Sequence, residues 1–250
     1  MKFLPFILLF FYLNSVAQSA SITEIDLNSE KFADASFPIR YPVINLGDKT
    51  ATDKINSIIK AQLLDENLFD TVITATLPAL KQYSKESLLG MEYKVLFNKN
   101  GILSLQVDCD AQGIYEYHYY RYFNFDLSTG QQLTLGDIIA PLRYALFKKI
   151  MFGKKLNALQ EYRHEMKVEA DSNFISAEEY NTCLNILKEN GCADSITLNE
   201  FSLEKGIIQV YDNCFFPHSM MAERPFYELK YTVRKDDEMI KKDFLLRLTP

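Results

Sequence analysis

The sequence predicts an α+β protein with a largely antiparallel sheet packed with several helices. Strand-like alternation is concentrated in the middle and at the end of the chain, whereas helical patterns are grouped near residues 48–68 and 138–190. Grouped elements favour antiparallel hairpins over strictly alternating βαβ units. The chain is 48% hydrophobic and 24% charged, which is typical of a globular protein and argues against disorder.

Residues 1–17 have the pattern of a cleavable signal peptide. Lys2 supplies a positive start, an apolar stretch follows, and small residues from Ser15 to Ala20 suit the peptidase. The apolar stretch, about 11 residues, would span roughly 16 Å as a helix, half of a hydrocarbon core, so a membrane anchor is disfavoured. We expect cleavage after Ala17, with Ser19 as the alternative position, and an exported protein that is secreted or periplasmic.

The mature chain is expected to be a single α+β module over residues 18–250. Its length is at the upper end of what one hydrophobic core supports. Two halves, about 18–112 and 113–250, that share a core are the alternative. No later window is apolar enough to span a membrane.

The first half of the chain predicts a strand, a helix and a hairpin. Residues 37–43 read as an edge strand because they contain two prolines. Asp48 can cap a helix that runs to about residue 68, followed by a helical or irregular segment to about residue 89. Alternation before and after the turn sequence Asn98-Lys99-Asn100-Gly101 predicts a β-hairpin, at residues 91–97 and 102–107.

The second half predicts helices followed by strands. A β-rich run covers residues 114–127, and a helical pattern from 138 to about 170 is broken near Gly153. Ser176 and Glu179 form a capping box for a helix that ends at Asn190-Gly191. Further strands are expected at 195–202, 207–211, 226–233 and 242–248.

The four cysteines are disulfide candidates, because an exported protein meets an oxidising compartment. They are Cys109, Cys183, Cys192 and Cys214, which allow three pairings. Cys183 and Cys192 are close in sequence, which would leave Cys109 with Cys214; buried thiols are the alternative. Since no Cys-x-x-Cys pair occurs, a zinc ribbon or a thioredoxin-like site has no support.

Three stretches occur in an order that resembles a known group of domains. They are Tyr41-Pro42 with Ile55-Asn56, residues 100–105 with 124–138, and residues 201–207 with 225–229. The order resembles the paired domains of unknown function in the outer part of lysozyme-sensing anti-sigma factors such as RsiV. Similar domains precede the catalytic domain of peptidoglycan deacetylases such as PdaC. The resemblance implies a bacterial envelope module, usually without its own catalytic apparatus, whose partner is a lysozyme-like protein or peptidoglycan.

The most unusual segment is the aromatic run from Tyr115 to Asp126. As a strand it places alternate residues on opposite faces. Its candidate ligand-binding residues are Tyr115, Tyr117, His118, Tyr119, Tyr120 and Tyr122. Tyrosine gives rigid contact area with a polar end, which suits a sugar ring or a protein partner. The alternative is structural, with one aromatic face feeding the core. Exposure of Tyr120 and Tyr122 beside His118 would favour a binding site.

We expect no catalytic residues, no metal ligands and no cofactor. A serine nucleophile elbow is absent from the sequence, and Glu161, His164 and Glu165 are expected to form a solvated helix face. The sequence therefore predicts a non-catalytic envelope binding module. The alternative is a small cell-wall hydrolase or deacetylase that uses Glu116, His118 and Asp126.

The charge balance also limits the partners. The formal net charge is −6, and lysines and arginines do not cluster as a nucleic-acid surface requires. An acidic balance permits a basic partner without demanding one.

Overall fold

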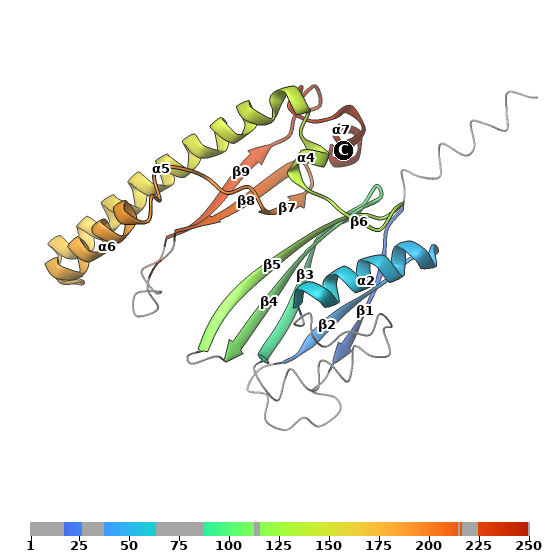
Figure 1. Cartoon of the computed structure of the whole chain (residues 1–250), viewed down its shortest axis with the longest axis horizontal. Coiled ribbons are helices and arrows are strands. Elements are labelled where there is room, and N and C mark those ends of the chain that lie inside the picture. Colours follow the sequence, from blue (N-terminus) through green and yellow to red (C-terminus); the bar gives the residue numbers. More distant parts are fainter. Residues whose placement is uncertain are drawn as a thin grey trace, which may run out of the picture. The chain divides into compact units, whose positions relative to one another are not determined.

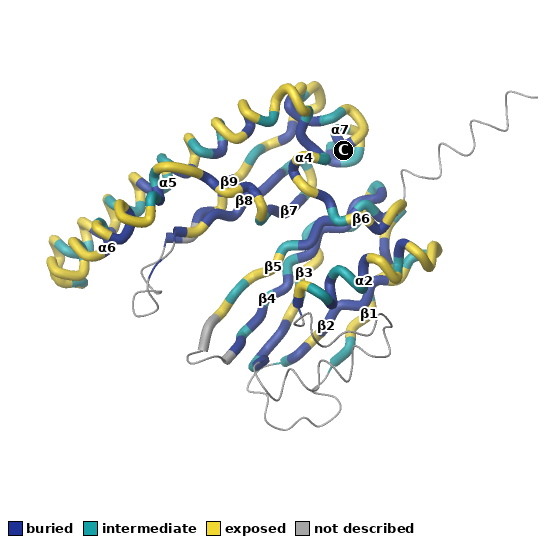
Figure 2. The backbone as a smooth tube through the Cα atoms, in the orientation of Figure 1, coloured by how far each residue is buried: buried dark blue, intermediate teal, exposed yellow. Residues whose placement is uncertain are grey.

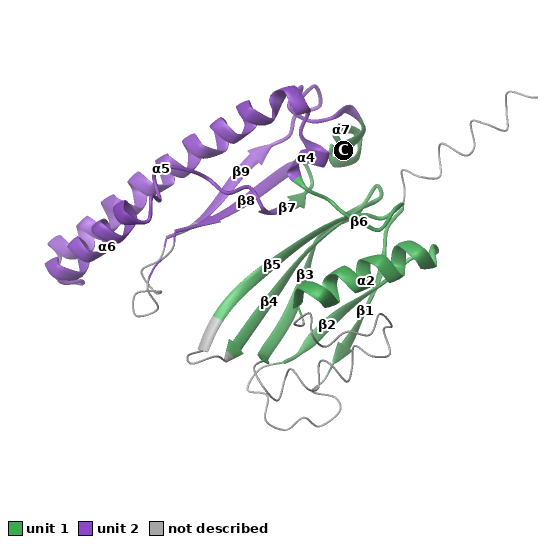
Figure 3. Ribbon diagram, viewed as in Figure 1, with its two compact units in different colours: residues 1–134, 202–206, 243–250 green, residues 135–201, 207–242 purple. Residues whose placement is uncertain are grey.

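The computed structural model describes residues 18–26, 38–63, 88–112, 116–214, 216 and 225–249 (Figure 1). The predicted signal peptide lies outside these residues and stays a prediction. Contacts divide the chain into two compact units (Figure 3). Unit 1 comprises residues 1–134, 202–206 and 243–250, and unit 2 comprises residues 135–201 and 207–242. The single module over residues 18–250, and the alternative of two halves that share a core, stay predictions.

Unit 1 is built on antiparallel strands. Strands β3 (Leu88–Lys99), β4 (Ile102–Gln112), β5 (Glu116–Asp126) and β6 (Gln131–Gln132) are neighbours in that order. A second pair, β1 (Ser21–Asp26) with β2 (Arg40–Asn45), is also antiparallel. A parallel bridge between Ile39 and Met91 joins the start of β2 to β3. The α+β class is thus confirmed, although the sequence did not predict β1.

The β3–β4 hairpin forms as predicted. Asn100 and Gly101 both adopt positive φ, 55° and 74°, which is what a two-residue turn between twisted strands requires. The register pairs Lys99 with Ile102 and extends to Leu88 with Ala111. β4 then pairs with β5 over its whole length, from Ile102 with Asp126 to Gln112 with Glu116.

Helix α2 (Lys49–Leu63) covers one face of this sheet (Figure 1). Asp48 caps it as predicted, since its Oδ1 accepts from Thr50 N at 2.7 Å. Apolar side chains at three- and four-residue spacing face the sheet, where they pack against the buried residues of β4 and β5; they are Ile55, Ile59 and Leu63. The expected extension to residue 68 and the segment that follows it lie outside the described residues.

Unit 2 places a long helix on the strands β8 (Ile207–Asn213) and β9 (Phe226–Thr232), which are antiparallel. β7 (Glu200–Glu204) is next to β8 in the same sheet order, although residues 202–206 are assigned to unit 1. The helices are α4 (Leu135–Ile138), a 3₁₀ turn (Pro141–Arg143), α5 (Tyr144–Asp171) and α6 (Ala177–Glu189). The predicted capping box of α6 is present: Ser176 Oγ accepts from Glu179 N at 3.1 Å.

Two predicted elements are wrong. α5 runs unbroken through Gly153, because its buried stripe of Phe147, Met151, Lys155 and Leu159 continues across that position. One glycine costs about 1 kcal/mol in a helix, which a buried stripe outweighs. Residues 242–248 form helix α7 (Lys242–Leu248), not a strand. Phe244 and Leu248 are buried at a four-residue spacing, and short apolar runs do not separate the two periods.

The strand expected at residues 195–202 begins only at Glu200. Thr197 instead bonds the buried Asp212, with its Oγ1 donating at 2.6 Å. Asp212 also forms an ion pair with Lys155 of α5 at 2.7 Å, and both side chains are buried. The segment before β7 is therefore held by side-chain hydrogen bonds in place of a ladder.

The pairing of Cys183 with Cys192 and of Cys109 with Cys214, which was based on distance along the sequence, is wrong. Cys192 and Cys214 form the disulfide, with 5.5 Å between their Cα atoms. Cys183 lies on the buried face of α6, and Cys109 lies in the core of unit 1; both are thiols. Burial raises the pKa of Cys109 to about 12, which keeps it protonated. Distance along the sequence did not predict the disulfide, because Cys183 lies within helix α6 and Cys192 lies beyond its end.

Buried Asn56 ties α2 to β2. Its side chain accepts from Ile44 N at 2.9 Å and donates to the carbonyl oxygens of Ile44 and Thr52 at 2.8 and 3.0 Å. We expect Asn56→Ala to lower the free energy of unfolding by about 2–4 kcal/mol, because two buried backbone groups of Ile44 lose their partner. Urea unfolding measures this loss, with the exposed Lys54→Ala on the same helix as the control. Equal stability of the two variants would contradict the role of Asn56.

The first described residues are bonded to the β3–β4 turn. Gln18 O accepts from Gly101 N at 2.8 Å, and Asn98 exchanges two hydrogen bonds with the backbone of Ala20, each 2.8 Å. The Gln18 side chain donates to Leu127 O at 3.3 Å. A chain that starts at Ala20 would lose the Gln18 contacts and leave the buried Gly101 N–H unpaired.

The predicted cleavage after Ala17 would keep these contacts, and we therefore expect the cleaved product to begin at Gln18. Intact-mass and N-terminal peptide mass spectrometry of the secreted product measure the position of cleavage. A product that starts at Ala20 would contradict this expectation, and an uncleaved product would contradict the signal peptide itself.

Candidate binding face

Antiparallel pairing of β3, β4 and β5 brings polar and aromatic side chains together on one face of unit 1. The cross-strand register aligns three rows of residues. The rows are Gly90, Asp110 and His118; Glu92, Asp108 and Tyr120; and Lys94, Gln106 and Tyr122. Side chains in one row point to the same side of a sheet. Asp108, Asp110, His118, Tyr120 and Tyr122 are called the aromatic–acidic face below.

The opposite side of the same strands is the core. Val107, Cys109, Phe123 and Phe125 are fully buried and alternate with the residues of the aromatic–acidic face. In Figure 2 most of β4 is buried, whereas β5 is more exposed over residues 118–122 than over residues 123–125. Because successive strand residues point to opposite faces, burial of one set presents the other outward.

His118 lies between two carboxylates. Its Nε2 is 2.9 Å from Asp108 Oδ1, and its Nδ1 is 2.8 Å from Asp110 Oδ1. The Nδ1 contact with Asp110 has the geometry of a hydrogen bond, whereas Asp108 Oδ1 has no hydrogen-bond partner among the described residues and lies beside Nε2 at ion-pair distance. Each ring nitrogen therefore has a carboxylate oxygen at 2.9 Å or closer.

The aromatic rings extend from His118 along β5. The rings of His118 and Tyr120 meet edge to face at 4.7 Å, and the Tyr120 and Tyr122 rings are 6.4 Å apart. Tyr120 is 36% exposed, and the His118 side chain is 43% exposed. Tyr122 is half-buried, so the exposure expected of both tyrosines for a binding site is found at Tyr120 alone.

Negative charge dominates the neighbourhood of Asp108. Burial raises the pKa of this carboxyl, and Asp110 and Glu92 raise it further, while His118 acts in the opposite direction. Glu92 is itself paired with Arg40 at 3.8 Å, an exposed contact of little strength. Asp108 and Asp110 together carry more negative charge than one imidazole can balance. This surface can therefore accept an additional cationic group.

The predicted tyrosines do not all reach this face. Tyr119 packs against the core, with the guanidinium of Arg121 5.3 Å from its ring centre. Tyr115 and the side chain of Tyr117 lie outside the described residues. His118, Tyr120 and Tyr122 are therefore the predicted residues that the structure brings together.

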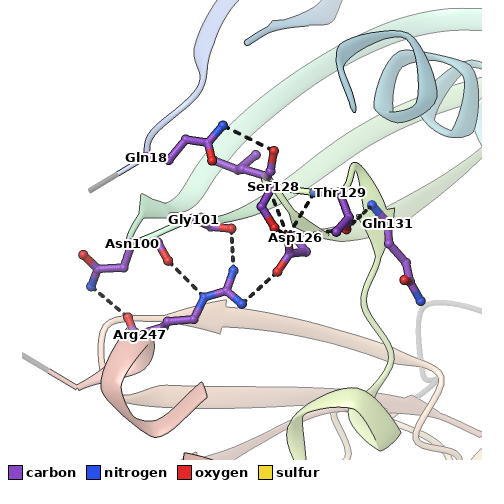
Figure 4. Close-up of polar contacts among 9 residues, drawn as sticks. Gln18, Asn100, Gly101, Asp126, Ser128, Thr129, Gln131 and Arg247 are labelled. Carbon is purple, nitrogen blue, oxygen red and sulfur yellow. Dashed lines mark hydrogen bonds and ion pairs between the residues drawn. The ribbon is translucent and has the colours of Figure 1, made fainter. Parts of the chain in front are cut away.

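The residues considered for catalysis are not gathered. His118 and Asp126 are on the same strand, eight positions apart, which corresponds to about 26 Å. Asp126 is instead bound by Arg247 of α7, whose Nη1 is 2.8 Å from Asp126 Oδ2 (Figure 4). The side chain of Glu116 lies outside the described residues.

Arg247 and Asp126 form the centre of a structural network (Figure 4). Arg247 Nε and Nη2 donate to the carbonyl oxygens of Asn100 and Gly101, at 3.0 and 2.6 Å. Asp126 Oδ1 accepts from the backbone N–H of Ser128 at 2.9 Å and also from its hydroxyl. This network fastens α7 to the β3–β4 turn.

The sequence does not predict Asp108 and Asp110 as site residues, because only the β4–β5 register makes them neighbours of His118. The available signal was the polar alternation of Gln106, Asp108 and Asp110 beside an aromatic strand. Within the described part of the chain, no group of three or more histidine, cysteine or acidic side chains is arranged to hold a metal ion. The described helices also include none with the length and apolarity to cross a membrane.

Comparisons with known proteins show the fold. No family model matches the chain, and no curated protein matches it. A DUF3298-family protein from Bacteroides fragilis has a similar structure, with a TM-score of 0.60 and 16% identity over 94% of this chain and 98% of its own. A DUF3298-family protein from Pseudomonas aeruginosa PAO1 has a TM-score of 0.53 and 14% identity, covering 91% and 97% of the two chains. DUF3298 denotes a domain of unknown function.

Asp126 gives the fold a defined acid dependence. Burial acts to raise its pKa, but hydrogen bonds from Ser128 and Arg247 and the charge of Arg247 outweigh burial and hold the pKa below its ordinary value. The ionised form therefore adds stability above the unfolded-state pKa, near 4, and this contribution is lost as pH falls through the lower folded-state value.

We expect Asp126→Asn to lower the free energy of unfolding by about 1–2 kcal/mol at pH 7 and by progressively less below pH ~4. Urea unfolding of both proteins between pH 7 and pH 2.5 measures the difference. The exposed Asp53→Asn is the control and should track the parent protein. A constant gap across this range would show that the charge of Asp126 is not involved.

Proposed function

We propose that this protein is an exported, non-catalytic binding module of the bacterial envelope and that its aromatic–acidic face holds a basic protein of the lysozyme type. The observation that carries the proposal is the position of His118 between Asp108 and Asp110, beside exposed Tyr120. Carboxylates supply attraction for lysine and arginine, and tyrosine supplies rigid contact area. Arginine can also pack on the tyrosine rings.

The geometry favours binding over catalysis. A carboxylate oxygen lies at 2.9 Å or closer to each ring nitrogen of His118 and takes the place where a substrate group would have to meet a general base. Asp126 is neutralised by Arg247 and lies far along the strand from His118. The constellation that a hydrolase or deacetylase would need is therefore not assembled from His118 and Asp126.

Two further observations support an envelope module. The Cys192–Cys214 disulfide suits an oxidising compartment, which agrees with the predicted signal peptide. The sequence resemblance to the outer domains of lysozyme-sensing anti-sigma factors supplies the partner class. A basic protein is preferred over a glycan because the face carries carboxylates, which an uncharged sugar does not need.

The test is calorimetry of the mature protein with lysozyme and, separately, sedimentation with peptidoglycan. We expect lysozyme to bind with a Kd on the order of tens of micromolar or tighter. The double substitution Asp108→Asn with Asp110→Asn should weaken binding about tenfold at low salt, and added salt should reduce this difference. Tyr120→Ala should weaken binding by a similar factor that salt does not remove.

The matched control is Glu161→Gln with Glu165→Gln, which removes two exposed charges from α5 and leaves the aromatic–acidic face intact. This variant should bind as the parent does. If both double variants weakened lysozyme binding equally, the effect would come from net charge alone, and the assignment of the binding face would be refuted. Absence of lysozyme binding at these concentrations would refute the partner, and sedimentation with peptidoglycan alone would assign a glycan in its place.

A further inference from the structure

Unit 2 contains a surface hollow of about 520 Å³, separate from the aromatic–acidic face. It lies where α5 meets β9 and the turn that follows β9. Ile150 and Tyr231 provide its apolar lining, and the Tyr231 ring is anchored by edge contact with buried Phe147 at 5.2 Å. The volume is in the range of small-molecule sites.

Three basic side chains from three different segments line this hollow: Lys154 of α5, Lys230 of β9 and Arg234 of the turn. None of them forms a hydrogen bond or ion pair through its side chain with the residues that the structure describes. An anion that contacts all three side chains would gain charge-assisted hydrogen bonds that the described residues do not supply.

Acidic residues also line the hollow, but two of the three are already engaged. Asp237 accepts from the Tyr231 hydroxyl at 2.9 Å and from Met239 N at 2.9 Å. Glu238 forms an ion pair with Arg143, a residue that does not line the hollow. Asp236 is the exposed carboxylate that remains at the rim. Asp237 keeps its negative charge, because both of its partners are neutral groups. The lining therefore has three cationic side chains against two carboxylates, Asp236 and Asp237, that are not paired with a cation, which leaves an excess of one positive charge.

We propose that this hollow binds a phosphorylated sugar, with Lys154, Lys230 and Arg234 around the phosphate and Tyr231 against the sugar ring. A phosphate monoester carries nearly two charges and three acceptor oxygens, which matches three independent donors. The Tyr231 ring and Ile150 offer the apolar surface that the carbon face of a sugar needs. The remaining volume exceeds what a bare phosphate would fill.

The probe is glucosamine 6-phosphate, titrated by calorimetry into the mature protein at low salt, beside glucosamine and inorganic phosphate. We expect glucosamine 6-phosphate to bind most tightly, inorganic phosphate more weakly and glucosamine not measurably below about 5 mM. Each single change, Lys154→Gln, Lys230→Gln or Arg234→Gln, should weaken binding about 3- to 5-fold, and the triple change at least about 20-fold. Asp236→Asn should strengthen binding about 2- to 3-fold.

The control is Lys148→Gln with Lys149→Gln, two exposed lysines of α5 that do not line the hollow. It should stay within about twofold of the parent. Urea unfolding of every variant separates lost binding from lost folding. The proposal is overturned if glucosamine 6-phosphate shows no saturable binding below about 5 mM, if glucosamine binds equally well, or if the control loses as much affinity as the triple variant.

Discussion

The unbroken antiparallel ladder between β4 and β5 is the constraint on which unit 1 depends. Its register, from Ile102 with Asp126 to Gln112 with Glu116, sorts two strands into an apolar side and a polar side at once. A shift by one residue would turn Phe123 and Phe125 outward and His118 inward, so burial of the aromatic core fixes the chemistry of the opposite face. The same ladder places Asp126 at the end where Arg247 fastens α7.

This dependence explains what the sequence predicts well and what it does not. Signals that act within a few residues were decisive: Asn100-Gly101 for the hairpin, Asp48 for the start of α2, and Ser176 with Glu179 for α6. Signals that depend on distant partners were not. Residues 242–248 could not be recognised as a helix, because Phe244 and Leu248 acquire their burial from the tertiary structure. The cysteine pairing and the acids beside His118 are determined in the same non-local way.

The candidate site shows the same division. His118, Tyr120 and Tyr122 could be placed on one strand face by alternation alone, and the structure brings them together. Asp108 and Asp110 required the register of the neighbouring strand. Asp108 and Asp110 change the role inferred for His118. A histidine with a carboxylate oxygen beside each ring nitrogen belongs to a charged surface, whereas a histidine with only Glu116 nearby would have been a candidate general base. The DUF3298 structures share the fold at 14–16% identity and leave the ligand to be inferred from this surface.

Carboxyl footprinting of the mature protein with and without lysozyme tests most directly whether the aromatic–acidic face is the binding surface. Carbodiimide coupling followed by peptide mass spectrometry measures the labelling of each exposed acid. Binding on the aromatic–acidic face predicts that labelling of Asp108 and Asp110 falls at least about threefold in the complex, while labelling of Glu161 and Glu165 is unchanged. Unchanged labelling of Asp108 and Asp110 in a complex that protects other acidic residues would contradict binding on the aromatic–acidic face.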